Sequence, residues 1–257
     1  MARSKNGKNK TGKVPVPTLE RLATYLRFLG DWEQANIDTI SSAEVERQTG
    51  INAAQFRKDL SYLGEFGKPG VGYNVPDLHN RIASKLKIDR EQRVILVGAG
   101  NLGSALVGYP GLNEYRFNIV AAFDNNPGKI GRPLWDLTIQ DVLTLKEVNQ
   151  RLRARIAILA VPATAAQQVA DLMVDAGIRA ILNFAPVLLR VPDHVFVRNV
   201  SFVQELAVLS YHLSGEETEL SADTSGPAAA NGSLPDGVVA PLPASHAPSH
   251  ELRKHRA

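Results

Sequence analysis

The segment between residues 93 and 124 constrains the fold of this chain more than any other part. An apolar run over residues 93–97 stops at a glycine-rich turn, and a second apolar run over residues 118–123 ends on Asp124. The turn consists of Gly98, Ala99, Gly100, Asn101, Leu102 and Gly103. Strand, G-x-G-x-x-G turn, helix, strand and acid follow in the order and length of a dinucleotide-binding βαβ unit. The sequence therefore predicts an α/β fold with a doubly wound parallel sheet.

Each glycine of the turn has a physical role in such a unit. Gly98 allows the tight turn, Gly100 lets the backbone approach a pyrophosphate, and Gly103 lets the helix pack on the strand. The phosphates would lie against free N–H groups at the helix N-terminus. Asp124, 21 residues after Gly103, is placed to accept hydrogen bonds from both hydroxyls of the adenosine ribose. Because a carboxylate there repels a 2′-phosphate, we expect NAD(H) rather than NADP(H). A glycine-rich turn without a ligand is the alternative interpretation.

Two more buried strands follow. Residues 156–161 form a continuous apolar run, which is typical of a strand covered on both faces, and residues 179–183 form the next strand. Ligands of open α/β sheets lie at the carboxyl ends of the strands, so Val161 and Pro162 are candidate cofactor contacts. Phe184 is either part of the wall of a nicotinamide pocket or an ordinary core residue.

Composition excludes several other classes of protein. The 257 residues include no cysteine, so there is no disulfide framework, thiolate metal site or cysteine redox chemistry. No window approaches 18 uninterrupted apolar residues, and the basic N-terminus lacks the apolar segment of a secretory signal. We therefore expect a cytoplasmic protein with no membrane partner and no metal. The net charge of +3 arises in residues 1–75, which contain 11 Lys and Arg against 8 Asp and Glu.

A helix-turn-helix pattern precedes the nucleotide-binding segment. Leucines recur with helical spacing over residues 19–29. Ser41 and Glu44 form a capping box for a second helix that ends near Gly50, and Asn52 caps a third helix after it. Two short helices joined by a four-residue turn that contains glycine are typical of DNA-binding helix-turn-helix units.

The outward face of the third helix carries groups that suit nucleic acid. A cation, an amide, a hydroxyl and a phenol match groove edges and phosphates better than plain solvation. These residues are Gln55, Lys58, Ser61 and Tyr62, with Arg57 at the flank. Four glycines and a proline over residues 64–73 then predict a β-hairpin wing with Lys68 at its tip. An ordinary three-helix bundle with a solvated polar face is the alternative interpretation.

Both ends of the chain differ from its centre. The first 15 residues are basic, and from about residue 214 the chain turns to Ser, Ala, Gly and Pro without any aromatic residue, a composition that favours disorder. Before this tail, an apolar helix that carries Phe202, Leu206 and Leu209 needs a partner surface, either on its own domain or in a second subunit. The predicted parts are a flexible arm (1–15), a winged-helix domain (16–85), a Rossmann domain (86–200), a C-terminal helix (201–217) and a disordered tail (218–257).

Several motifs between about Leu19 and Leu213 together resemble the Rex-type redox-sensing transcriptional repressors, and they are jointly very specific. The matching segments are residues 55–62, 67–73, 98–103, 122–124, 161–163 with 166–167, and 176–178 leading to 182–186. The resemblance implies a winged-helix domain followed by a Rossmann domain, with a C-terminal helix exchanged between subunits. It also implies a homodimer that binds palindromic operator DNA and is released when NADH replaces NAD⁺.

The resemblance also implies roles for individual residues. A lysine that matches Lys129 lies near the adenine ribose in the family. Tyr109 matches a tyrosine near the nicotinamide that takes part in the switch, and its usual partners are an arginine, matched by Arg27, and an aspartate that opens the exchanged helix. Ser201 stands in place of that aspartate. A charge exchange cannot occur there in the same form, so we expect weaker coupling or less dependence on NAD⁺.

Two other functions compete with this interpretation. A dehydrogenase needs a substrate domain and an acid–base group beside the nicotinamide. The chain has no histidine between His79 and His194, and the fold ends soon after the cofactor strands, so we expect no enzyme activity. A CoA-binding domain without redox sensing has similar motifs at residues 161–163 and 177–178. Asp124 disfavours CoA, because CoA carries a 3′-phosphate on the same ribose.

Overall fold

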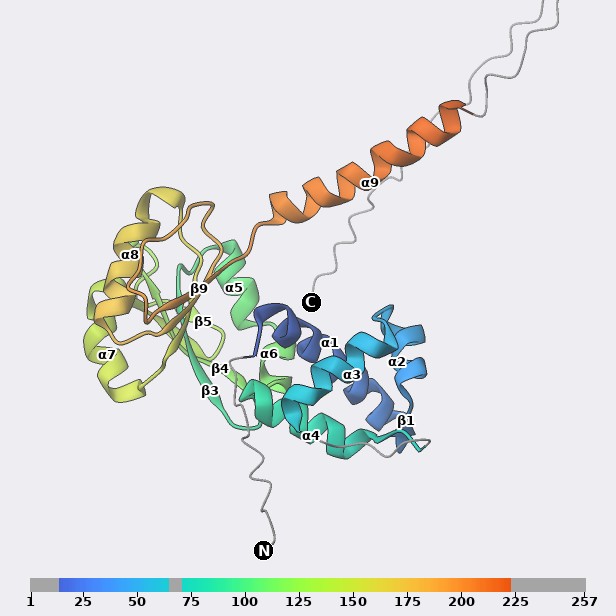
Figure 1. The fold of residues 1–257 in the computed structure, drawn as a ribbon. Helices are drawn as coiled ribbons and strands as arrows, with labels where there is room; N and C mark the ends of the chain where they lie inside the picture. The colour runs from blue at the N-terminus through green and yellow to red at the C-terminus, as the bar shows by residue number, and fades with distance from the viewer. Residues whose placement is uncertain (1–13, 65–70, 223–257) are drawn as a thin grey trace, which may run out of the picture. The chain divides into compact units, whose positions relative to one another are not determined.

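The computed structural model describes residues 14–64 and 71–222, with the side chains of residues 214–222 left out (Figure 1). The first elements are α1 (Val16–Gln34), β1 (Thr39–Ile40), α2 (Ser42–Thr49), α3 (Ala53–Leu60), the 3₁₀ helix η1 (Ser61–Leu63), β2 (Tyr73–Asn74) and α4 (Val75–Leu86). They are followed by β3 (Gln92–Val97), α5 (Asn101–Val107), α6 (Pro110–Glu114), β4 (Phe117–Asp124), β5 (Pro133–Leu134), β6 (Leu137–Asp141), η2 (Val142–Thr144), α7 (Leu145–Leu152), β7 (Ile156–Leu159), α8 (Ala163–Asp175), β8 (Ala180–Asn183), β9 (Phe196–Asn199) and α9 (Phe202–Ala222). The chain divides into a compact unit that ends at Phe202 and a second unit that begins at Val203.

The helix-turn-helix forms as the sequence predicts. The hydroxyl of Ser41 accepts a hydrogen bond from the N–H of Glu44, and the Glu44 carboxylate accepts one from the N–H of Ser41. α2 ends where Gly50 adopts a left-handed conformation with φ of 69°, which glycine reaches without steric cost. The side chain of Asn52 then caps α3 by accepting a hydrogen bond from the N–H of Ala54. The capping box, the turn and the third helix are therefore confirmed.

A buried carboxylate joins α1 to α3. Asp59 is fully buried and accepts two hydrogen bonds of 2.7 Å from the guanidinium of Arg21. The hydroxyls of Thr18 and Tyr25 and the amide of Gln55 also donate to it, at 3.2, 3.0 and 2.9 Å. Burial alone would raise the pKa of Asp59, but these hydrogen bonds and the guanidinium charge outweigh burial and lower its pKa. These hydrogen bonds therefore hold α1 and α3 together inside an apolar core.

The rest of this domain is built around that core. Phe56 of α3 lies edge-on to the rings of Tyr25 and Tyr73, at centroid distances of 4.9 and 5.4 Å. β1 pairs antiparallel with β2, with Ile40 opposite Tyr73. Residues 65–70 lie outside the described part of the chain, so the wing and Lys68 stay predictions.

The remaining strands form one seven-stranded sheet in the order β5-β6-β4-β3-β7-β8-β9. All neighbours are parallel except β5 and β6. The chain winds outward from β3 in one direction and returns to add β7 on its other side. The crevice at the carboxyl ends of β3 and β7 is therefore the topological switch point, where ligands of such sheets bind. The predicted Rossmann-like fold is confirmed.

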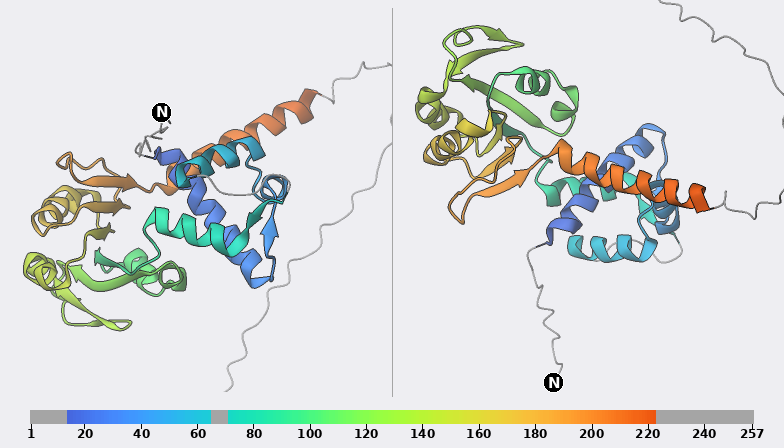
Figure 2. Two further views of the ribbon diagram at one scale, coloured as in Figure 1. Left: turned by 60° about the horizontal axis from the view of Figure 1, so that its bottom comes forward. Right: turned by 90° about the horizontal axis from the view of Figure 1, so that it is seen from above.

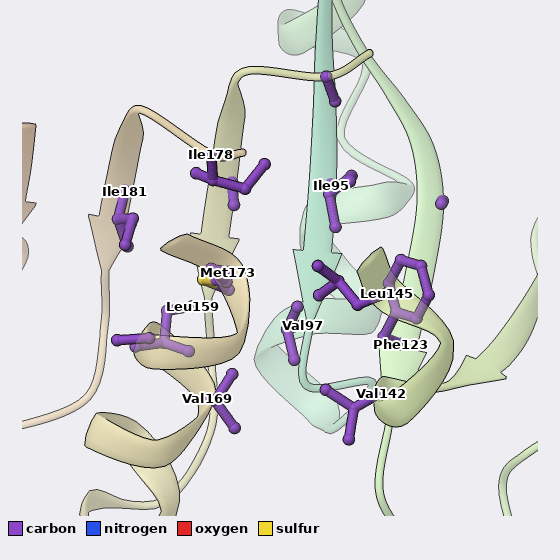
Figure 3. Packing of buried hydrophobic residues seen from close by; sticks show 14 of the residues in the cluster. Ile95, Val97, Phe123, Val142, Leu145, Leu159, Val169, Met173, Ile178 and Ile181 are labelled. Atoms are coloured by element: carbon purple, nitrogen blue, oxygen red, sulfur yellow. The ribbon is translucent and has the colours of Figure 1, made fainter. Parts of the chain in front are cut away.

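Helices cover both faces of this sheet (Figures 1 and 2). α7 and α8 cover one face, where Phe123, Leu159 and Met173 are fully buried (Figure 3). α5 covers the other face, where Leu106 packs against a cluster that includes Leu96. Apolar faces on both sides explain why the strands read as continuous apolar runs in the sequence.

α9 extends to Ala222, five residues beyond the predicted end of the helix. Residues 218–222 are therefore helical, and their assignment to a disordered tail was wrong. Glu219, Leu220 and Ala222 are good helix formers that the low-complexity composition of the tail concealed. The rest of the predicted tail, residues 223–257, lies outside the described residues. Across the described chain, every helix is too short or too polar to cross a membrane.

The network around Asp59 predicts how this domain responds to mutation and to acid. Asp59→Asn keeps the shape but leaves the Arg21 guanidinium without its anionic partner, so we expect it to lower the free energy of unfolding by about 3 kcal/mol. Because folding lowers the pKa of Asp59, its stabilisation is complete above the unfolded value of about 3.9 and is lost as pH falls through the lower folded value. Urea unfolding of the full chain between pH 3 and 7 measures both effects. Glu44→Gln, at the half-buried capping box, is the control: glutamine can still accept from the N–H of Ser41, so the expected cost is below about 0.5 kcal/mol. Equal urea midpoints for Asp59→Asn and the wild type would contradict this account.

Candidate functional site

A cavity of about 550 Å³ lies at the topological switch point of the sheet. Its volume is within the range of small-molecule and cofactor sites. Of the residues predicted to bind a cofactor, eight line it: Gly98, Gly100, Asn101, Leu102, Asp124, Lys129, Val161 and Pro162. The ends of β3, β4 and β7 thus bring together segments that are up to 64 residues apart in the chain.

The three glycines of the turn differ in what surrounds them. Gly98 has φ of 105°, and a Cβ there would collide with the carbonyl oxygen of Ala160. A Cβ on Gly103 would collide with the carbonyl oxygen of Gly98, so the close packing of α5 on β3 needs glycine. By contrast, no atom lies within 4 Å of the place where Gly100 would carry a Cβ. That open side faces the cavity and is the point at which a ligand can approach the backbone.

The carboxylate of Asp124 ties the glycine-rich turn to the end of β4. Its oxygens accept hydrogen bonds from the N–H of Ala99 at 3.0 Å, from the N–H of Asn126 at 2.9 Å and from the Lys129 ammonium at 3.0 Å. Asp124 is 8% exposed. Burial raises the pKa of this carboxyl, but the three donors outweigh burial and lower it. Asp124 is therefore ionised in a site that also contains one cation.

These features fit a dinucleotide. A carboxylate has about four lone-pair positions, so three protein donors leave Asp124 able to accept a hydroxyl. Gly100 leaves room for a diphosphate close to the backbone, and Asn101 and Leu102 open α5 at the cavity wall. Lys129 partly neutralises Asp124, so the repulsion of a 2′-phosphate is weaker than an isolated carboxylate would give.

Four of the predicted cofactor contacts do not line this cavity: Ala99, Gly103, Tyr109 and Phe184. Ala99 and Gly103 are buried in the turn and at the start of α5. Tyr109 lines a second cavity of about 350 Å³, together with Trp135. Phe184 packs against the apolar cluster on the α5 face of the sheet, and its ring centroid is 6.3 Å from that of Phe202. The predicted contacts of Tyr109 and Phe184 with a nicotinamide stay predictions.

Sequence reasoning missed other residues of the cavity wall. Asn126 donates its N–H to Asp124, and its side-chain oxygen accepts a hydrogen bond from the N–H of Gly128. The Asn-Asn-Pro-Gly segment that follows Asp124 is a turn signal that could have placed Asn126 beside the acid. Val142 and Thr164 also line the cavity, but no local pattern marks them.

Only some of the residues predicted to contact DNA from α3 are exposed. Lys58, Arg57 and Ser61 are exposed, and Arg57 donates a hydrogen bond of 2.7 Å to the hydroxyl of Ser42. Tyr62 is half-buried in η1. The prediction that Gln55 points outward was wrong, because its amide donates to the buried carboxylate of Asp59.

The predicted switch residues lie on separate elements. Arg27 is exposed on α1, with its guanidinium carbon 5.2 Å from the centre of the Phe28 ring. Tyr109 is 58% exposed just before α6, and Ser201 directly precedes α9. Among the described residues there is no cluster of three or more His, Asp or Glu side chains that could hold a metal ion.

Comparison with known proteins identifies the family. The redox-sensing transcriptional repressor Rex of Pelotomaculum thermopropionicum is 48% identical over 210 residues, which cover 82% of this chain and 99% of the relative. The protein of the same name from Desulfitobacterium hafniense is 46% identical and is covered over 97% of its length. The chain belongs to the Rex family. These relatives are named as transcriptional repressors and not as enzymes, in agreement with the sequence-based expectation.

Solved structures agree with this assignment. The crystal structure of RSP, described as a Rex-family repressor, has a TM-score of 0.76 and 36% identity, covering 82% of this chain and 99% of RSP. RSP in complex with β-NAD⁺ and operator DNA has a TM-score of 0.76 at 38% identity, covering 83% of this chain and all of that one. Residues 13–61 match the family model "Putative DNA-binding protein N-terminus", and residues 89–187 match the model "CoA binding domain".

The glycine geometry predicts opposite effects of two similar substitutions. Gly103→Ala forces α5 away from β3, so we expect a loss of about 2 kcal/mol, in the range for overpacking. Gly100→Ala meets no atom within 4 Å, and its φ of −84° suits alanine, so stability should change by less than about 0.5 kcal/mol. Thermal unfolding of both variants tests this contrast. A destabilisation of Gly100→Ala as large as that of Gly103→Ala would refute this geometry of the turn.

Proposed function

We propose that this Rex-family chain is a cytoplasmic transcriptional repressor that binds palindromic operator DNA as a homodimer. NADH binding to its Rossmann domain releases the DNA. The main support for this proposal is that one chain combines a helix-turn-helix with a cavity at the switch point of the sheet, and that Asp124 lines this cavity. The RSP relative, which aligns over its whole length, is described in complexes with β-NAD⁺ and operator DNA and with β-NADH.

The cavity would supply contacts for the diphosphate and the adenosine ribose of NAD(H). The open side of Gly100 would admit the diphosphate, and the exposed N–H groups at the start of α5 would stabilise its charge. Asp124 would accept a ribose hydroxyl, while Lys129, whose side chain is 37% exposed, can turn from the carboxylate toward the ligand. Val161 and Pro162 would bound the nucleotide at the end of β7. When bound, the cofactor presents a nicotinamide whose charge depends on its redox state.

CoA binding without redox sensing is the second candidate. The match of residues 89–187 to a CoA-binding family favours it. Asp124 and the full-length Rex relatives oppose it, because a 3′-phosphate would approach a buried carboxylate. Titration with CoA beside NADH and NAD⁺ separates these candidates.

The DNA-binding surface would centre on the exposed part of α3. Lys58 and Ser61 are free of the core on this face, and Arg57 flanks them. The wing residue Lys68 would add a second phosphate contact. A symmetric dimer would then recognise two half-sites one or two helical turns apart.

The exposed apolar side chains of α9 support the dimer. Phe202, Leu206, Leu209 and Leu213 are between 59% and 64% exposed. A soluble chain rarely leaves so many large apolar side chains on one helix in water. Exchange of α9 between two subunits would cover them, as the family resemblance implies.

The switch would combine the nicotinamide with Tyr109, Arg27 and the start of α9. Ser201 carries no charge to exchange, so release must come mainly from displacement of these elements rather than from a new ion pair. NADH shifts the equilibrium only by as much as it prefers the DNA-free state. We expect that coupling to be smaller than it would be with an aspartate at this position.

Asp124 sets the choice of cofactor in this proposal. Asp124→Ala removes a charge-assisted acceptor and also frees Lys129, so NADH affinity should fall at least tenfold, equivalent to about 1.4 kcal/mol. The gap between NADH and NADPH should narrow, because the remaining ammonium favours a 2′-phosphate. Fluorescence titration with both cofactors measures this, with Asp193→Ala, outside the cavity wall, as the charge-matched control. Equal affinities of the wild type for NADH and NADPH would refute this role of Asp124.

Lys58 provides a test of the DNA surface. Lys58→Ala should reduce the slope of log K against log salt by about one unit per subunit, because one phosphate contact and its released counterion are lost. Lys146→Ala on α7 removes the same charge from the other domain and should leave the slope unchanged. If the slope of log K against log salt for Lys58→Ala equals that of the wild type, α3 does not lie on DNA as proposed.

A further inference from the structure

α6 connects two tyrosines that lie in different surroundings. Tyr109 directly precedes the helix and is 58% exposed, whereas Tyr115 directly follows it and is partly buried. Pro110 is the first helical residue, and its ring fixes φ at that point. The helix of five residues is about 7 Å long. α6 is therefore a short, stiff link between these two side chains.

Tyr115 reaches from the nucleotide domain into the winged-helix domain. Its side chain packs against the apolar core that α1, α3 and α4 form. Burial raises the pKa of its phenol, Glu114 and Asp31 raise it further, and Arg27 lowers it. α1 contributes Leu22, Tyr25, Leu26 and Leu29 to that core, so Tyr115 packs against a cluster that α1 helps to form.

α1 in turn is fastened to the recognition helix. Arg21 of α1 donates two hydrogen bonds of 2.7 Å to Asp59 of α3. Because Asp59 is fully buried and also accepts from Thr18 and Tyr25 of α1, the two helices cannot slide past each other without breaking this network. A force on α1 therefore moves α3 as well.

The nucleotide domain touches α1 at a second place. Arg198 of β9 forms an ion pair with Glu20, and both side chains are about half exposed. Exposed pairs contribute little to stability, so this contact can guide α1 but holds it less firmly than the packed ring of Tyr115. The nucleotide domain therefore contacts the winged-helix domain at two places, through the ring of Tyr115 and through the Arg198–Glu20 pair.

The other end of α6 has room to move. The ring of Tyr109 lies on Gly111, where a Cβ would come within 2.7 Å of it, and it borders the cavity of about 350 Å³. Behind it, the indole of Trp135 occupies the place of a Cβ on Gly108 and donates a hydrogen bond of 3.2 Å to the carbonyl of Ser104. The end of α5 is thus braced, while Tyr109 and α6 face open space.

We propose that α6 is the element that transmits the state of the nucleotide domain to the winged helix, with Tyr115 as the positioning residue that acts on α1. This inference rests on the proposed function, because it needs a repressor whose DNA affinity depends on NADH. Movement of Tyr109 shifts α6, Tyr115 carries the shift to α1, and the Arg21–Asp59 pair carries it to α3. Tyr115 touches neither nucleotide nor DNA.

Operator affinity with each cofactor tests this role in the full-length protein. The probe is a DNA duplex selected by the wild-type protein from a random pool, and the quantity is the ratio of its dissociation constants with NADH and with NAD⁺. Tyr115→Ala should reduce this ratio at least threefold and leave NADH affinity within twofold of wild type. Tyr115→Phe keeps the packed ring and should restore the ratio. Asn113→Ala, exposed on the same helix, is the control and should match the wild type.

Three outcomes would overturn the inference. A wild-type ratio in Tyr115→Ala would show that other contacts carry the coupling. If Tyr115→Ala lowers NADH affinity as well as the ratio of operator dissociation constants, Tyr115 stabilises the nucleotide fold instead. If Tyr115→Ala does not fold, Tyr115→Leu replaces it. This variant should reduce the ratio of operator dissociation constants by the same factor, and an unchanged ratio would overturn the inference. A wild-type protein with equal operator affinity in both cofactors refutes the proposed function itself, and with it this inference, so the two failures are distinguishable.

Discussion

The carboxylate of Asp124 joins the glycine-rich turn to the loop that follows β4, about 25 residues later in the chain. It accepts hydrogen bonds from the glycine-rich turn through Ala99, from its own loop through Asn126, and from Lys129. The path of the turn decides where Gly100 presents its open side, so the shape of the cavity depends on this one acid. In the proposed function the same oxygens would also accept a ribose hydroxyl.

A second buried carboxylate, that of Asp59, connects separate elements in the winged-helix domain in a similar way. Asp59 fixes α3 to α1 through Arg21, Thr18 and Tyr25. Each acid is kept ionised, because hydrogen bonds and a cation outweigh the cost of burial. A repressor needs a recognition helix that moves as one piece with its support, and a charged network of this kind resists gradual deformation better than apolar packing, which tolerates small shifts.

Local patterns in the sequence predicted the elements, but not the contacts that connect them. The apolar runs, the glycine spacing and the caps at Ser41 and Asn52 are local signals, and the structure follows them. Gln55 was misplaced because a helical wheel cannot reveal that Asp59, one turn later, is buried against α1. The hydrogen bond from Ala99 to Asp124 and the packing of Tyr115 against the winged-helix core likewise arise only when distant segments meet. The extension of α9 to Ala222 was missed because tail composition outweighed helix propensity in the prediction.

If the nucleotide cavity controls DNA binding, operator affinity must follow the ratio of NADH to NAD⁺. Fluorescence anisotropy of a labelled operator bound to the wild-type protein would be followed as NADH replaces NAD⁺ at constant total nucleotide and constant salt. We predict that anisotropy falls to the value of free DNA and recovers when NAD⁺ is added back, while Gly100→Ala does not respond. An anisotropy that stays constant or rises with NADH would contradict the account.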